Sequence, residues 1–423
     1  MKRTLVVILL GLLCLSMFSV FAPEVKAQQS TVDWWPTLHH DLAHTGYSTS
    51  TGPLTNLLLW SYTTGDIVDY SSPAVVNGEV YVGSNDNYIY DLYAATGAYV
   101  WSYKTGNSID SSPAVANGIV YVGSEDHNVY ALNATTGTKI WSYGTGDEVE
   151  SSPAVANGIV YVGSDDNKVY ALNATTGSKI WSYGTDDHVI SSPAVVNGVV
   201  YVGSEDDNVY ALDAATGSKI WSYATGDQVD SSPTVVNGIV YVGSDDYNVY
   251  ALNAASGSRI WSFGTGYYVD SCPAVANGVV YVGSQDDNVY ALNATTGSKI
   301  WSYSTGSEVE SSPAVANGVV YVGSDDNNVY ALNATSGDTI WTYGTGDLVD
   351  SSPAVANGVV YVGSNDDNVY AFGTIEVSVP EFPSQALDFM LFTIMVCVAF
   401  AVIVAKKKRI YGKILQERAL HHE

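Results

Sequence analysis

Cysteine and positive charge are both scarce in this sequence of 423 residues. Its 3 Cys are too few to staple a chain of this length, which excludes a disulfide-dependent scaffold. Lys and Arg number 16 against 43 Asp and Glu, a formal charge of −27. Nucleic-acid binding is excluded, because phosphate contacts require clustered basic side chains. Neither heptads nor glycine at every third position occur, so fibrous folds are excluded, whereas 32 Tyr and 10 Trp supply enough apolar surface for a core.

The first 27 residues have the pattern of a signal peptide. Lys2 and Arg3 precede an apolar run from Leu5 to Phe21, and Val25-Lys26-Ala27 is a small-residue cleavage site. We therefore expect export of the chain; an uncleaved membrane anchor is the alternative.

Residues 386–405 have the pattern of a transmembrane helix. Twenty residues rise about 30 Å along a helix, the thickness of a hydrocarbon core. The basic cluster Lys406–Arg409 follows at once, and basic residues stay on the cytoplasmic side. The sequence predicts a single-pass cell-membrane protein with an extracellular body and a cytoplasmic tail over residues 406–423. A buried core helix is the alternative.

The linker of residues 374–385 contains Val379-Pro380-Glu381-Phe382-Pro383. This motif, followed by the apolar span and the basic cluster, resembles the archaeal PEF-type C-terminal sorting signal. The resemblance implies sortase-like processing near Pro380–Pro383 and display at the cell surface. The tail from Ile410 to Glu423 is longer than expected of such signals.

The middle of the chain is one unit of 40 residues repeated eight times. The unit from Ser151 to Thr185 is rich in alternating Val, Ile and Tyr, which is typical of strands. Asn157-Gly158 is a hairpin signal, and Asp165-Asp166-Asn167 and Thr176-Gly177 supply two further turns. Each unit is therefore predicted to form four short antiparallel strands, with no helix between them.

Four strands in 40 residues is the size of a propeller blade. Ala131 to Gly137 followed by Trp141 resembles the tryptophan-docking motif AxDxxTGxxxW of the quinoprotein (PQQ-like) repeat, with Asn in place of Asp, and Ala211 to Trp221 matches that motif in full. The resemblance implies an all-β fold, an eight-bladed β-propeller over residues 54–373. Leu57 to Tyr62 precedes any inner strand, so we expect it to complete the eighth blade and close the ring. The tryptophans expected to dock between blades are Trp60, Trp101, Trp141, Trp181, Trp221, Trp261, Trp301 and Trp341.

Residues 28–53 precede the ring and are expected to pack across it, with Trp34 and Trp35 buried. His39, His40 and His44 lie within six residues, so a transition-metal site is the alternative.

An acidic residue recurs just before the first, innermost strand of most units. Radial repetition would place these carboxylates in a ring at the channel mouth, where hard oxygen ligands suit Ca²⁺ or Mg²⁺. The alternative is solvated loop carboxylates. Ile190 interrupts the series, and an inserted Tyr70 displaces Asp69. The ring consists of Asp110, Glu150, Asp230, Asp270, Glu310 and Asp350.

Four Asn-Ala-Thr sequons lie in the turns between the third and fourth strands, on the face opposite the acidic ring. In an exported protein they are glycosylation candidates; the alternative is that Asn only replaces the Asp of the docking motif. The four are Asn133, Asn173, Asn293 and Asn333.

Some quinoproteins are quinone-dependent dehydrogenases, and the resemblance to them implies a vicinal Cys–Cys disulfide, a stacking Trp, and Glu, Asn and Asp around Ca²⁺. Cys14, Cys272 and Cys397 cannot form a vicinal pair, so no PQQ and no catalytic residue is expected. We predict a non-catalytic surface scaffold for binding or adhesion, with a surface protein or glycan as partner. A dehydrogenase-like enzyme and an envelope protein-assembly factor are the alternatives.

Overall fold

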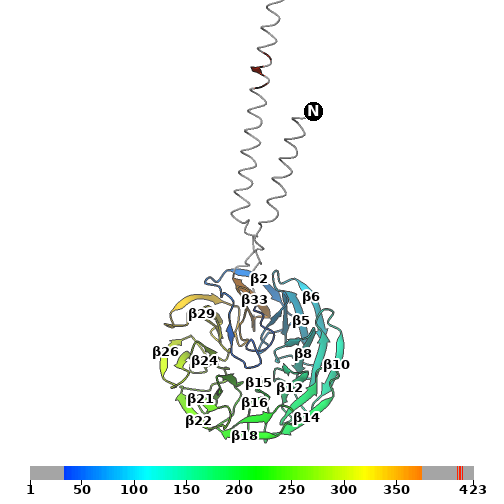
Figure 1. Cartoon of the computed structure of the whole chain (residues 1–423), viewed down its shortest axis with the longest axis vertical. Helices are drawn as coiled ribbons and strands as arrows, with labels where there is room; N and C mark the ends of the chain where they lie inside the picture. Colours follow the sequence, from blue (N-terminus) through cyan, green and yellow to red (C-terminus); the bar gives the residue numbers. More distant parts are fainter. Residues whose placement is uncertain (1–32, 374–406, 408, 411, 413–423) are drawn as a thin grey trace, which may run out of the picture. The chain divides into compact units, whose positions relative to one another are not determined.

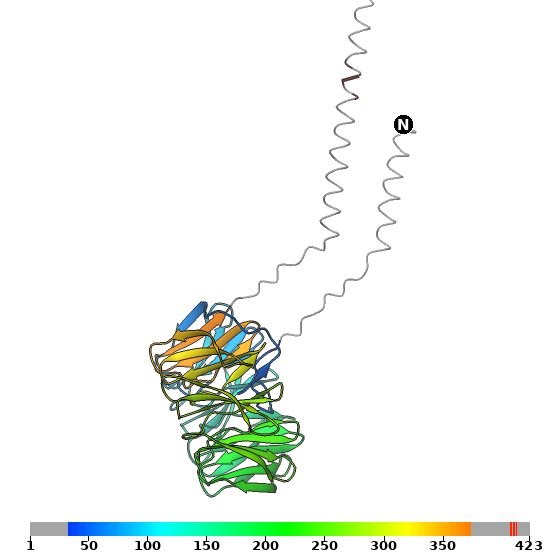
Figure 2. The same cartoon turned by 90° about the vertical axis from the view of Figure 1, so that its left-hand side faces the viewer.

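The computed structural model describes residues 33–373, together with Lys407, Arg409, Ile410 and Gly412. Residues 33–373 form eight antiparallel sheets arranged around a common axis, seen face-on in Figure 1 and edge-on in Figure 2. The predicted all-β, eight-bladed propeller with four antiparallel strands per blade is confirmed.

Each blade contributes one strand to each of four concentric positions. The innermost strands of blades 1 to 8 are β3 (Ala74–Val76), β7 (Ala114–Ala116), β11 (Ala154–Ala156), β15 (Ala194–Val196), β19 (Thr234–Val236), β23 (Ala274–Ala276), β27 (Ala314–Ala316) and β31 (Ala354–Ala356). The second strands are β4 (Glu79–Gly83), β8 (Ile119–Ser124), β12 (Ile159–Ser164), β16 (Val199–Ser204), β20 (Ile239–Ser244), β24 (Val279–Ser284), β28 (Val319–Ser324) and β32 (Val359–Ser364). The third strands are β5 (Tyr88–Tyr93), β9 (Asn128–Asn133), β13 (Lys168–Asn173), β17 (Asn208–Asp213), β21 (Asn248–Asn253), β25 (Asn288–Asn293), β29 (Asn328–Asn333) and β33 (Asn368–Gly373). The outer strands are β6 (Tyr99–Lys104), β10 (Lys139–Gly144), β14 (Lys179–Gly184), β18 (Lys219–Ala224), β22 (Arg259–Gly264), β26 (Lys299–Ser304), β30 (Thr339–Gly344) and, in blade 8, β2 (Leu58–Thr63).

Blade 3 shows why the sequence folds in this way. Asn157 (φ 52°) and Gly158 (φ 78°) both adopt left-handed backbone, which the tight turn between β11 and β12 requires and which other residue types resist. The second and third strands are covered on both faces by neighbouring blades, so five consecutive residues of β12 and four of β13 are buried. In the outer strand β14 only Trp181 is buried, because only one face of the strand is covered.

The ring is closed by the N-terminal strand, as the sequence predicts. β2 pairs antiparallel with β33, with Trp60 opposite Ala371 (Figure 1). Trp60 Nε1 donates a hydrogen bond to Ala94 O of blade 1 at 2.8 Å, and Trp181 Nε1 donates the equivalent bond to Ala214 O at 3.0 Å. All eight docking tryptophans are 7–8% exposed, so each holds one blade against the next.

Two closed belts of serine hydrogen bonds also join the eight inner strands. Ser71 Oγ donates to Ser111 O, and the pattern repeats from blade to blade until Ser351 Oγ donates to Ser71 O at 3.0 Å. A second belt runs through backbone N–H groups and the next serine along, as between Ser352 N and Ser72 Oγ. Both belts return to their starting point, so the inner strands form a complete circle.

The segment from Trp35 to Ser48 crosses the inner strands and closes one end of the channel. Its backbone accepts hydrogen bonds from the central Val of six inner strands, for example from Val195 N to Leu42 O at 2.7 Å. The last part, β1 (Tyr47–Ser48), adds a parallel fifth strand to β27. Trp35 is 1% exposed, whereas Trp34 is only partly buried, so one of the two tryptophans predicted to be buried departs from the prediction.

Several predicted segments lie outside the described residues: the signal peptide over 1–27, the linker over 374–385 and the transmembrane helix over 386–405. The four described residues of the tail are helical. Within the described parts of the chain, no helix has both the length and the apolar character needed to cross a bilayer.

Candidate functional site: an acidic channel mouth

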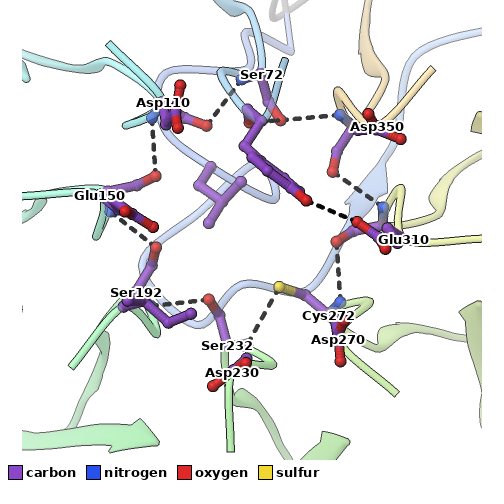
Figure 3. Close-up of a pocket in the computed structure, with 17 residues that line it drawn as sticks. Ser72, Asp110, Glu150, Ser192, Asp230, Ser232, Asp270, Cys272, Glu310 and Asp350 are labelled. Atoms are coloured by element: carbon purple, nitrogen blue, oxygen red, sulfur yellow. Dashed lines mark hydrogen bonds between the residues drawn. The ribbon is translucent and has the colours of Figure 1, made fainter. Parts of the chain in front are cut away.

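A cavity of about 240 Å³ lies on the propeller axis (Figure 3). Its wall is the second serine belt, in which Cys272 replaces one serine and its Sγ accepts a hydrogen bond from Ser232 N at 3.3 Å. Leu38 of the N-terminal segment also lines it. The end of the cavity opposite the N-terminal segment is the mouth, and it opens on the face that we call the upper face. This face carries the loops before the inner strands and the turns between second and third strands; the opposite face is the lower face.

The six carboxylates predicted to form a ring line this mouth together. Asp110, Glu150, Asp230, Asp270, Glu310 and Asp350 all border the cavity, at equivalent positions of six blades (Figure 3). Ile190 takes the equivalent position in blade 4 and Tyr70 takes it in blade 1. The Tyr70 hydroxyl reaches blade 7 and donates a hydrogen bond to Glu310 Oε2 at 2.8 Å. The inserted tyrosine therefore occupies part of the opening.

A second ring of polar residues surrounds the first, and the sequence analysis did not identify it as a partner of the first. It occupies the first position of each turn between second and third strands. Gln285 Nε2 donates to Asp270 Oδ2 at 2.7 Å and to Glu310 Oε1 at 2.8 Å, so this residue bridges two ring members. Recurrence fifteen residues after each ring carboxylate is the signal that could have revealed it. The members are Asn85, Glu125, Asp165, Glu205, Asp245, Gln285, Asp325 and Asn365.

Burial and crowding raise the pKa of the ring carboxyl groups. Burial first, and the adjacent second-ring carboxylate next, raise the pKa of Asp110 to about 8, of Asp230 to about 8 and of Glu150 to about 7. Among the described residues, the only ion pair that involves Lys or Arg joins Lys168 to Asp166, away from the ring. The ring therefore lacks a basic partner of its own and retains protons near neutral pH.

Three acidic trios, and one mixed group that contains a histidine, offer ligand atoms at cation-binding spacing in the described part of the chain. In each, one ligand atom per residue lies within 4.8 Å of the others. Ca²⁺ takes six to eight oxygen ligands, so three carboxylates and water fit it. The trios are Glu148–Glu150–Asp165, Asp230–Asp245–Asp270, Glu308–Glu310–Asp325 and the mixed group Asp187–His188–Glu205.

The three N-terminal histidines do not converge in this way. His39 and His44 are almost fully buried, and burial lowers the pKa of His39 to about 3. His40 Nε2 contacts Asp33 Oδ1 at 2.9 Å instead. Their arrangement is that of a packed turn at the channel floor.

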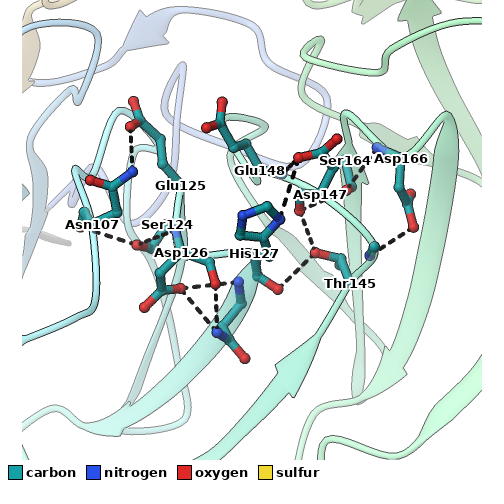
Figure 4. Close-up of polar contacts among 12 residues, drawn as sticks. Asn107, Ser124, Glu125, Asp126, His127, Thr145, Asp147, Glu148, Ser164 and Asp166 are labelled. Carbon is teal, nitrogen blue, oxygen red and sulfur yellow. Dashed lines mark hydrogen bonds and ion pairs between the residues drawn. The ribbon is translucent and has the colours of Figure 1, made fainter.

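The aspartate that recurs in all eight upper turns has a structural role. Asp126 Oδ2 accepts hydrogen bonds from the Tyr130 hydroxyl at 2.6 Å and from Gly106 N at 2.6 Å, tying the turn to the preceding loop. Figure 4 shows the neighbouring residue His127, which contacts Asp147 Oδ1 of the next loop at 3.3 Å. These contacts hold the upper-face loops in fixed positions around the mouth.

The sequon asparagines lie at the ends of the third strands, on the lower face. Asn133 Oδ1 accepts hydrogen bonds from Thr135 N and Thr136 N, each at 3.0 Å, which is the turn-capping role of the Asp in the docking motif. Asn173, Asn293 and Asn333 cap their turns in the same way. Glycosylation of these side chains stays a prediction.

The channel residues do not fit a bound quinone. PQQ is a polycarboxylate, and an anionic ligand would face the six ring carboxylates without a lysine or arginine among the residues that line the cavity. Cys272 is the single cysteine among residues 33–373, and it is free, so the vicinal pair of the dehydrogenases is missing from this part of the chain. We therefore derive no step through this cofactor.

Comparisons with solved structures agree with the propeller fold. BamB from Moraxella catarrhalis superposes with a TM-score of 0.66 and 20% identity over 75% of this chain and 99% of that chain. A europium-containing methanol dehydrogenase gives 0.71 and 15% over 81% and 98%. A quinohemoprotein alcohol dehydrogenase from Comamonas testosteroni gives 0.69 and 17% over 82% of each chain. No curated protein matches this chain.

A family assignment comes from the repeats themselves. The family model described as outer membrane protein assembly factor BamB matches residues 50–188, 186–268 and 249–375, which includes every blade of the ring. The solved structures, at these low identities, show a shared fold and do not separate assembly factors from dehydrogenases. On the strength of the three matches, this chain belongs to the PQQ-like repeat family described as outer membrane protein assembly factor BamB.

Proposed function

We propose that this protein is a non-catalytic binding scaffold whose upper face recognises a basic partner outside the cell. One observation carries the proposal: six ring carboxyl groups, with five more among the eight polar residues of the second ring, surround the mouth of a channel whose other end the N-terminal segment closes. Burial first, and repulsion from the adjacent carboxylates next, raise the pKa values of Asp110 and Asp230, and no lysine or arginine lines the cavity to supply a counter-charge. A cationic group placed in the mouth would replace the bound protons and relieve this repulsion.

The near-identity of the eight blades supports a binding role over catalysis. A catalytic centre requires one blade to differ from its neighbours in a way that brings a nucleophile, an acid and a base together. The departures at the mouth, Tyr70, Ile190 and Cys272, bring together no such group. A dye-linked dehydrogenase assay after addition of PQQ and Ca²⁺ tests this point, and turnover would overturn it.

Besides a basic partner, the acidic trios favour divalent cations as ligands. We propose that Ca²⁺ bridges ring carboxylates and the second ring, so that partner binding depends on the cation. Calorimetric titration of CaCl₂ into the full-length chain should give heat and a higher melting temperature. Neither effect in the wild-type chain would remove the cation from the proposal.

The basic partner is tested with a pair of matched variants. Asp230→Asn with Asp270→Asn removes two carboxyl groups from the ring of carboxylates, whereas Asp213→Asn with Asp338→Ser removes two carboxyl groups from the lower face and installs residues that other blades already carry. Binding of a lysine-rich peptide to the ring variant should be at least tenfold weaker than to the wild type. An equal loss in both variants would show nonspecific attraction to total charge.

An envelope protein-assembly role is the second candidate, because the matching family model is described by that activity. We propose surface display through the predicted span over 386–405 and processing near Pro380–Pro383, with glycans on the sequons shielding the lower face. Mass spectrometry of the native protein tests the glycans and the processed end. Accumulation of misassembled envelope proteins in a deletion strain would favour the assembly role, and normal envelope proteins would favour adhesion.

A further inference from the structure

Blades 5 and 6 depart from the repeat at neighbouring positions of the upper face. Tyr267 and Tyr268 stand where blade 3 has Asp147 and Glu148, in the loop before the inner strand. Tyr247 stands where blade 3 has Asn167, in the turn between β20 and β21. Three aromatic residues thus replace polar ones around one section of the mouth.

The three tyrosines form a shelf. The rings of Tyr247 and Tyr267 stack with centroids 5.4 Å apart and an interplanar angle of 18°, and the centroid of Tyr268 lies 4.3 Å from that of Tyr267. Tyr247 is 41% exposed and Tyr267 is 40% exposed, so this stack contacts solvent and does not fill a core. A stack of exposed rings is a surface for an aliphatic or cationic group.

The shelf borders the trio Asp230–Asp245–Asp270. Tyr247 follows Asp245 by two residues, and Gln285 links Tyr268 to the trio, since its N–H donates to Tyr268 O at 3.0 Å and its Nε2 donates to Asp270 Oδ2 at 2.7 Å. Shelf and trio therefore lie at the same junction, between blades 5 and 6.

This trio differs from the other acidic trios in the described residues. Each of its three members has a buried Oδ1 atom without a hydrogen-bond partner, whereas Glu148–Glu150–Asp165 and Glu308–Glu310–Asp325 have one such atom each. Asp245 is only 9% exposed, so its free oxygen cannot be satisfied by bulk water. The site is therefore short of hydrogen-bond donors and of positive charge.

A lysine side chain supplies both the hydrogen-bond donors and the positive charge that this site lacks. Its ammonium group has three donors, one for each member of the trio. Three acceptors about 2.8 Å from one tetrahedral nitrogen lie about 4.6 Å apart, and one carboxylate oxygen of each trio member lies within 4.8 Å of the others. The aliphatic stem of lysine would lie along the tyrosine rings. The chain already places a lysine ammonium over a tyrosine ring, since Lys219 Nζ lies 5.8 Å from the ring centroid of Tyr210.

We propose that the tyrosine shelf and the trio Asp230–Asp245–Asp270 form a pocket for a lysine side chain presented by a partner protein. This inference rests on the proposed function and names the residue class that the upper face recognises. Charge favours lysine over a neutral sugar, which would leave three carboxyl groups without a counter-charge. A lysine ammonium offers one donor to each member of the trio, whereas Ca²⁺ would need water molecules besides these carboxylates to reach its six to eight oxygen ligands.

The test uses the full-length chain and the peptide acetyl-Gly-Gly-Lys-Gly-Gly-amide, with norleucine in place of lysine as the uncharged control peptide. The informative variant is Tyr267→Asp with Tyr268→Glu, the pair found in blade 3, which adds two negative charges. Attraction to charge alone would tighten lysine binding to this variant. The pocket predicts binding at least tenfold weaker, and at least tenfold weaker in Asp245→Asn.

Matched controls are Asp213→Asn and Tyr99→Lys on the lower face, each of which installs a residue found at that position in other blades and should leave lysine binding unchanged. Unchanged or tighter binding to the Tyr267→Asp/Tyr268→Glu variant would overturn the pocket while leaving the acidic face as a general binding surface. Absence of lysine binding to the wild-type chain would count against both the pocket and the proposed function. Binding of a methyl glycoside or of CaCl₂ alone, without lysine binding, would also overturn the proposal and identify a sugar or metal site.

Discussion

Replacement of Asp91 by alanine should stabilise the protein. Asp91 lies in β5 of blade 1, is 1% exposed, and keeps a buried Oδ1 atom without a partner. Every other blade has a fully buried alanine at this position: Ala131, Ala171, Ala211, Ala251, Ala291, Ala331 and Ala371. The alanine side chain therefore fits the blade geometry, and Asp91→Ala removes an uncompensated polar group without leaving an unusual cavity.

The size of the gain follows from the carboxyl pair that Asp91 forms with Glu79. Burial, then the charge of Glu79, raises the pKa of Asp91 from 3.8 to about 8. At about 1.4 kcal/mol per pH unit, that difference sets an upper bound of about 6 kcal/mol on the destabilisation at pH 8. Glu79 is partly exposed and can turn towards water, so we expect about half of this bound, about 3 kcal/mol. For about 340 folded residues, that corresponds to a rise of about 4 °C in melting temperature.

The effect has a defined pH dependence. Because the folded-state pKa of Asp91 is raised, the folded state holds a proton that the unfolded state has lost between about pH 4 and pH 8. Folding stability therefore falls as pH rises through this window, and the advantage of Asp91→Ala grows across it. Urea denaturation of the full-length chain at pH 4 and pH 8 measures both, with Asp91→Asn as the neutral polar control. An equal difference at both pH values, or a destabilised alanine variant at pH 8, would refute the reasoning.

Three further predictions concern the closure of the propeller and the ring of carboxylates. Trp181→Ala and Trp60→Ala should each lower the free energy of unfolding, measured in urea, by about 3–5 kcal/mol, because β2 is an integral strand of blade 8. A much smaller loss for Trp60→Ala would argue against closure of the propeller by the N-terminal strand. Without divalent cations, the melting temperature of the wild type should fall as the pH rises from about 4 to about 8, because Asp110 and Asp230 have folded-state pKa values of about 8. A melting temperature that rises over this range would contradict the raised pKa values of the ring carboxyl groups. Ile190→Asp restores the missing ring position, so it should lower the melting temperature at pH 8 and increase the heat of CaCl₂ binding; an unchanged heat would show that blade 4 does not face the same site.

The fold was predictable because repetition amplifies weak local signals. One Asn-Gly pair is a modest indication of a turn, but the same pair at every fortieth residue specifies a hairpin in each blade. The strand inventory also predicted that Leu57 to Tyr62 would complete blade 8, since an unpaired outer strand and an incomplete blade can satisfy each other's backbone groups. The ring carboxylates followed from the same radial repetition.

Features that occur only once in the chain could not be predicted from the repeats. The path of Trp35 to Ser48 over six inner strands depends on tertiary contacts that no local pattern encodes. Tyr70 was identified as an insertion, but its reach across the mouth to Glu310 follows from the curvature of the ring. The tyrosine shelf could not be predicted from the sequence, because Tyr247 lies twenty residues before Tyr267 and joins it through the packing of blade 5 against blade 6.

Zero-length cross-linking on intact cells tests the central claim, that the acidic upper face is the binding surface. A carbodiimide couples carboxyl groups to lysines in direct contact, so cross-linked peptides identify the face that meets the partner. We predict cross-links from the ring and the second ring, above all from peptides that contain Asp230, Asp245 or Asp270. Cross-links confined to lower-face residues such as Asp213 and Asp338 would contradict the account.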